Sequence, residues 1–135
     1  MADSILLTRS DLLEALRDNL PTGYGLDDVN WPNIKFTRGK GGAKWLKALI
    51  INNETNNNAA GSGHKITAGI FVVEVNYPKG SGETGAIQDA QHIKSIFENK
   101  RFSNTSTQAS SILFTGVNDN WYTIQIQTNY YYEGS

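Results

Sequence analysis

The feature that most constrains the fold is a change in hydrophobic spacing along the chain. Between Ala86 and Phe97 the apolar residues recur at intervals of three and four, which predicts an amphipathic helix. In Lys65–Tyr77 and Trp121–Tyr132 apolar and polar residues instead alternate, as they do in half-buried strands. Helices and strands that occupy separate stretches of one chain predict an α+β fold.

The N-terminal region predicts a second amphipathic helix. Thr8 precedes a run of leucines at helical spacing, and Asp11 stands where a variant capping box places its acidic residue. Pro21 and Gly23 are expected to end this helix. For the later helix, Ser81 or Thr84 is the expected cap.

Three strands are predicted between the helices. Val29–Phe36 reads as a short edge strand, because Pro32 cannot donate a hydrogen bond to a sheet. Trp45–Ile51 is a denser apolar strand. In Lys65–Tyr77 the alternation changes parity near Phe71, which predicts either a bulge or burial on both faces.

The remaining segments complete the predicted order αβββαββ. Ser110–Val117 and Trp121–Tyr132 flank a polar turn and predict a β-hairpin. Asn52–His64, rich in Asn and Gly, predicts a long flexible loop. We therefore expect residues 1–135 to form a single domain, with a mostly antiparallel sheet of about five strands and two helices packed on one face.

Charge and cysteine content exclude several function classes. Twelve Lys and Arg residues against thirteen Asp and Glu residues give a net charge of -1, so specific nucleic-acid binding is not expected. A chain without cysteine has no disulfide framework, thiolate zinc site or cysteine nucleophile. The apolar run Ile5–Leu7 is too short for a signal sequence or a membrane span, so we expect a soluble protein of the cytoplasm without a membrane partner.

Candidate chemical groups do not combine into a catalytic site. His64 and His92 lack a second histidine at metal-ligand spacing, and both are predicted to be surface residues. The acidic pair Asp27 and Asp28, and Asp119 with Glu98, are interpreted as solvated. The sequence predicts no catalytic residue, cofactor site or metal site.

Two segments carry residues suited to binding. Arg38–Lys44 (RGKGGAK) combines glycines with cations but does not match the phosphate-loop motif, so a mobile basic tip is favoured over a phosphate site. If it binds a partner, an acidic protein face and nucleic acid fit equally well. The terminal tyrosine cluster supplies contact area of the kind used at interfaces, or it packs on its own domain. The candidate interface residues are Arg38, Lys40, Lys44, Asn56, Asn57, Asn58, Asn129, Tyr131 and Tyr132.

The order of these segments resembles the tail terminator-like proteins of tailed bacteriophages. The likeness covers roughly Thr8–Tyr132 and rests on Trp31 with Pro32, on the strand exit YPKGSG before the second helix, and on the closing hairpin at Trp121. These are patterns of order and residue type rather than a signature motif. The Asn52–His64 insert is longer than the resemblance requires.

The resemblance implies a structural virion protein without a reaction or a cofactor. Such a protein forms a ring, usually of six subunits, on the finished tail tube, stops tube polymerisation and offers a surface for head-neck joining. The implied partners are further copies of itself, the tail tube protein and a head-neck connector. The implied location is the capsid-proximal end of the virion tail, after assembly in the host cytoplasm.

Ring closure needs two different patches on each subunit. We expect one patch in the Arg38–Lys44 and Asn52–His64 loops and the other near Asn129–Tyr132. Two other functions stay open: another phage neck or head-completion protein, and a small monomeric ligand-binding or inhibitor module with a defined pocket. An enzyme is the class that the sequence supports least.

Overall fold

The computed structural model describes residues 4–34, 36, 43–52, 56–58, 64–103 and 105–134. Its elements are α1 (Ser4–Asp18), a 3-10 turn η1 (Leu26–Asp28), β1 (Val29–Asn30), β2 (Trp45–Asn52), β3 (Asn56–Asn58), β4 (His64–Pro78), α2 (Thr84–Phe97), β5 (Ser106–Asn118) and β6 (Trp121–Gly134). No helix in these ranges is both long and apolar enough to cross a membrane.

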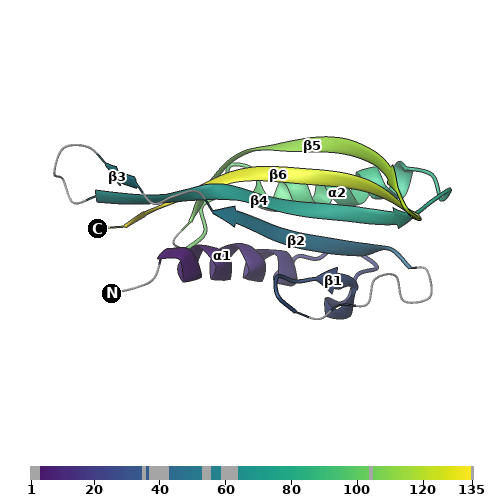
Figure 1. The fold of residues 1–135 in the computed structure, drawn as a ribbon, viewed down its shortest axis with the longest axis horizontal. Helices are drawn as coiled ribbons and strands as arrows, with labels where there is room; N and C mark the ends of the chain where they lie inside the picture. The colour runs from purple at the N-terminus through teal and green to yellow at the C-terminus, as the bar shows by residue number, and fades with distance from the viewer. Residues whose placement is uncertain are drawn as a thin grey trace.

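The strands form one six-stranded sheet with the order β1-β2-β4-β6-β5 and with β3 paired beside β4. Only β1 and β2 run parallel, and every other pair is antiparallel. Figure 1 shows β5 along one edge of the sheet and β1 with β2 toward the other. The predicted α+β fold with a mostly antiparallel sheet is confirmed.

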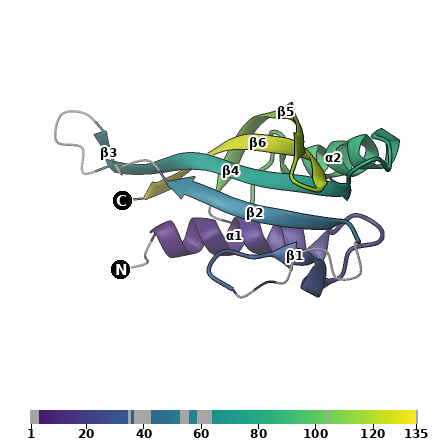
Figure 2. The same ribbon diagram turned by 45° about the vertical axis from the view of Figure 1, so that its right-hand side comes forward.

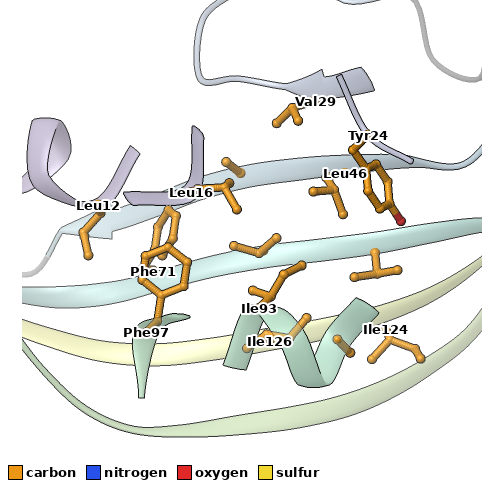
Figure 3. Packing of buried hydrophobic residues seen from close by; sticks show 14 of the residues in the cluster. Leu12, Leu16, Tyr24, Val29, Leu46, Phe71, Ile93, Phe97, Ile124 and Ile126 are labelled. Carbon is orange, nitrogen blue, oxygen red and sulfur yellow. The ribbon is translucent and has the colours of Figure 1, made fainter. Parts of the chain in front are cut away.

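Both helices pack on one face of this sheet. α1 contacts β2, β4 and β6, while α2 contacts β4, β5 and β6 (Figure 2). Figure 3 shows the core between helices and sheet, where Leu12 and Leu16 from α1 belong to one cluster with Ile93 and Phe97 from α2. Phe71 packs edge-on against Phe97, with 4.8 Å between the ring centroids. The opposite sheet face carries no helix in the described part of the chain.

The second helix and the hairpin agree with the sequence. α2 spans Thr84–Phe97, and its buried residues are all members of the predicted apolar stripe. β5 and β6 form the hairpin around Asp119, which adopts a φ of 57° at the tight turn. The half-buried alternation predicted for Trp121–Tyr132 is also confirmed, since Ile124 and Ile126 are fully buried while Gln125 and Gln127 are partly exposed.

The predicted helix caps are wrong. α1 begins at Ser4, so Thr8 lies inside the helix with its side chain fully buried. The Asp11 carboxylate does not cap the helix but accepts a hydrogen bond from Thr105 Oγ1 at 2.9 Å. At α2 the capping position is Glu83, without a side-chain cap, while Ser81 donates to the Pro78 carbonyl. Asp11 and Ser81, two of the expected capping residues, are therefore engaged in a tertiary contact and in a turn instead.

Two strand predictions need correction. The edge strand expected at Val29–Phe36 is limited to Val29–Asn30, because the chain turns at Pro32. Asn52–His64 is not one continuous loop, since Asn56–Asn58 forms β3 and pairs with β4. The register of β4 is continuous, so its parity change reflects burial on both faces rather than a bulge.

Candidate assembly surfaces

The predicted interface residues are divided between the two ends of the sheet. Lys44 immediately precedes β2, whereas Asn56–Asn58 follows the far end of that strand, so these two segments do not form one patch. Asn56–Asn58 instead lies across β4 from the end of β6, since Ile66 pairs with both Asn56 and Glu133. Arg38 and Lys40 lie outside the described residues.

The tyrosine cluster at the end of β6 has two environments. Tyr130 is buried in the core, where Gly69 leaves room for its ring, and burial raises the pKa of its hydroxyl. Asn129 is exposed, and Tyr131 and Tyr132 are partly exposed. Two of the three tyrosines therefore have surface available for contact with another chain.

Lys44 belongs to a partly buried polar cluster. We call Tyr24, Lys44, Tyr77 and Asp89 the Asp89 cluster. Asp89 Oδ2 accepts hydrogen bonds from the Tyr24 hydroxyl at 2.8 Å, the Tyr77 hydroxyl at 2.6 Å and Lys44 Nζ at 3.2 Å. The Lys44 amine also lies 4.4 Å from the centre of the Tyr24 ring, within cation-π range.

The surroundings of the Asp89 cluster raise the pKa values of its three hydrogen-bond donors. Burial, followed by the Asp89 charge, raises the pKa of the Tyr24 hydroxyl far above its usual value. Burial and the hydrogen bond to Asp89 also raise the pKa of Tyr77. Burial lowers the pKa of Lys44, but the hydrogen bonds to Tyr77 and Asp89 outweigh it and the net shift is upward. The cluster therefore ties the start of β2 to α2.

Sequence reasoning missed this cluster. It singled out Lys44 for its neighbouring glycines, while Tyr24, Tyr77 and Asp89 come from three other parts of the chain. No spacing rule connects residues 45 positions apart, as Lys44 and Asp89 are. A tyrosine at the end of a strand and an acidic residue on a helix face are both common, so neither predicts a cluster by itself.

A groove of about 740 Å³ lies on the sheet surface away from the helices. Glu74 accepts a hydrogen bond from Gln125 Nε2 at 2.9 Å, and Thr123 donates to Asn76 at 2.7 Å. Trp45 and Trp121 meet edge-on at one side of the groove. Within the described ranges no group of three or more His, Cys, Asp or Glu residues could hold a metal ion.

The two long edges of the sheet differ in chemistry. β5 contains no charged residue and no proline over its 13 residues, and Leu113, Phe114 and Val117 are exposed on it. The other edge exposes Leu49 and Ile51 of β2, which β1 covers only at Leu46 and Lys47. Monomeric proteins usually protect an edge strand with charges or proline. Both edges are therefore candidates for contact between chains.

The chain is similar to known proteins in both sequence and fold. A family model described as the phage tail terminator protein matches residues 11–130. One solved protein structure aligns with 99% of this chain and 99% of its own, with a TM-score of 0.74 and 23% sequence identity, which shows a shared fold alone. No curated protein matches the chain. Since the family model spans most of the sequence, the chain belongs to the phage tail terminator protein family, a family of structural components of the virion tail.

Proposed function

We propose that the protein assembles as a ring on the completed tail tube, stops the tube from growing further and offers a joining surface to the head-neck connector. The observation that carries this proposal is the family match over residues 11–130. The ring would hold about six subunits and would occupy the capsid-proximal end of the tail. In this role the whole chain acts as one structural domain and performs no reaction.

The unlike edges of the sheet support a ring rather than a two-fold dimer. A two-fold dimer joins the same patch on both subunits, whereas a ring joins two different patches. One edge here is the uncharged strand β5, and the other consists of β2 with the short strand β1. Two different edges on opposite sides of one sheet are what a closed head-to-tail assembly requires.

The ends of the sheet remain for the other partners. Asn56–Asn58 and the end of β6 share one end, which carries the partly exposed Tyr131 and Tyr132. Aromatic residues with a polar tip are enriched at protein interfaces. We assign this end to contact with the tail tube protein or the connector, and the sheet edges to contact between copies.

Two measurements test the proposed ring. Light scattering over a concentration series should show a closed species near six times 14.9 kDa, roughly 90 kDa, because association follows mass action. Electron microscopy of purified tail tubes should show the protein at one tube end, and its addition should stop further elongation. A protein that stays monomeric and leaves tube growth unchanged would refute the proposal.

Substitutions at the tyrosine end separate folding from assembly. Tyr131→Ser and Tyr132→Ser should leave the monomer folded and weaken its attachment to the tube end, because both side chains are partly exposed. Tyr122→Ser at the other end of β6 is the matched control, since Tyr122 is partly exposed as well and donates to Glu83. Loss of folding in the first two variants would show instead that these tyrosines are core residues.

A further inference from the structure

Phe114 stands at the end of a row of core residues that crosses the sheet. Cross-strand pairing aligns Val29, Leu46, Val75, Ile124 and Phe114, from β1 at one edge to β5 at the other. The first four are buried to 2% exposure or less, while Phe114 is 57% exposed. Paired residues on neighbouring strands point to the same face, so Phe114 extends the core row beyond its last covered position.

The backbone beside Phe114 is also open for pairing. The first part of β5 is covered by the preceding segment, where Thr107 N donates to the Lys100 carbonyl and Asn99 N to the Gln108 carbonyl. From Ser111 to Asn118, no other strand of the described chain pairs with the outer side of β5. An uncharged strand with a free outer side and exposed apolar side chains is a template for pairing with another chain.

The opposite edge carries an apolar socket of about 300 Å³. Its apolar lining is Leu13 of α1 with Leu26, Trp31, Pro32 and Ile34 around β1, and Ser10, Glu14 and Arg17 of α1 complete the lining. Leu26 and Ile34 are 55% and 61% exposed, so this apolar surface lies in water when the chain is alone. Trp31 Nε1 donates to the Leu26 carbonyl at 3.1 Å, which holds one wall of the socket in place.

Size and strand direction make the two edges complementary. A cavity of roughly 150 Å³ is enough to bind benzene, so the socket has room for a phenyl ring. β1 runs parallel to β2, and β2, β4, β6 and β5 alternate in direction, so β1 and β5 are antiparallel. A rotated copy that continues the sheet therefore brings β5 of one chain antiparallel to β1 of the next.

We infer that Phe114 of one chain inserts into the socket lined by Leu26, Trp31 and Ile34 of a second copy. β5 and β1 then lie side by side, and the core row continues from Phe114 to Val29 of the next chain. β5 carries no charge that has to lose its water in this contact, and the two charged residues at the socket, Glu14 and Arg17, are exposed in the single chain. The inference rests on the proposed ring function, since it names the two surfaces through which the copies meet.

Substitutions on each side of the contact test its energetics. Phe114→Ser and Ile34→Asp should each weaken self-association by at least about tenfold, the range of a residue central to an interface. Both side chains are exposed in the single chain, so circular dichroism should show an unchanged fold. Leu6→Ser is the matched control, because Leu6 is 65% exposed on α1 but does not line the socket. Its self-association should stay within about twofold of the parent.

Engineered cysteines test the geometry, since the chain has no cysteine of its own. Cross-strand pairing aligns Asn30, Lys47, Glu74, Gln125 and Leu113 on the face away from the helices. Oxidation of a mixture of Asn30→Cys and Leu113→Cys chains should give a disulfide-linked dimer, and neither variant alone should do so. A chain with both substitutions should give a ladder that stops at the subunit number of the ring.

The outcomes separate this inference from the proposed function. One outcome is a ring of the expected mass that tolerates Phe114→Ser and forms no disulfide between the Asn30→Cys and Leu113→Cys chains. It would overturn the inference and leave the ring function standing. A protein that neither associates nor binds a tube end would overturn both. A cross-linked ladder together with weakened association of Phe114→Ser would support both.

Discussion

Replacement of Asp89 by alanine should destabilise the protein by about 3 kcal/mol. A hydrogen bond to a charged group contributes roughly 1.5–3 kcal/mol, and Asp89 Oδ2 accepts three of them. These bonds share one oxygen, so their free energies do not add. The side chains of Lys44 and Asp89 are 24% and 13% exposed, which lets water replace part of the lost interaction. The whole effect should therefore be close to that of one strong bond.

Two further variants should lose less stability than Asp89→Ala. Asp89→Asn keeps an acceptor oxygen but removes the charge, and we expect roughly half the loss. Tyr24→Phe removes one hydroxyl donor and should lower the free energy of unfolding by about 1 kcal/mol.

Urea unfolding followed by tryptophan fluorescence measures all three variants, since the chain has three tryptophans. At a slope of roughly 2 kcal/mol/M, Asp89→Ala should lower the midpoint by about 1.5 M. A loss below about 0.5 kcal/mol for Asp89→Ala would refute the reasoning, because it would mean that water satisfies the three donors equally well.

Two further predictions concern backbone space and pH. Gly69→Ala should destabilise by more than about 2 kcal/mol, because a β-carbon there collides with a β2 carbonyl and lies 2.6 Å from the Tyr130 hydroxyl. Gly80→Ala, in open space at a φ of 86°, should cost about 1 kcal/mol in the same urea assay, and equal losses would contradict the steric argument. Raised pKa values in the Asp89 cluster mean that the folded state holds its protons more tightly. The free energy of unfolding should keep the full contribution of these groups below about pH 10 and should fall at higher pH. The fall should be steeper in the unsubstituted protein than in Asp89→Ala. Parallel pH profiles of urea unfolding would argue against this linkage.

The helical and strand elements were largely predictable because their hydrophobic spacing is local. The stripe from Ala86 to Phe97 reappears as α2, and the alternating segment from Trp121 reappears as β6. The errors arose where a distant contact decided the local structure. Thr8 looked like a cap, but its side chain is fully buried within α1. Asn56–Asn58 has no strand propensity, yet it lies beside a long β4 that offers free backbone groups.

The candidate surfaces were predictable only in part. The sequence identified Tyr131 and Tyr132 as contact residues, and the structure leaves both partly exposed; their role stays a prediction. It did not identify Phe114, which reads as an ordinary apolar residue of a hairpin strand. Phe114 is exposed because β5 is the last strand of the sheet and because α2 does not cover the part of β5 that carries Phe114.

The sequence by itself determined the fold class, the two helices, the hairpin and the family resemblance, because each depends on residue type and spacing within a few turns of chain. Tertiary structure alone decided the order of strands in the sheet, and with it which edges face solvent. It also brought Lys44 to Asp89. It placed Phe114 at one end of the core row and the socket lined by Leu26, Trp31 and Ile34 at the other. The physical reason is that pairing between strands joins residues far apart in sequence, and local spacing carries no information about which strands become neighbours.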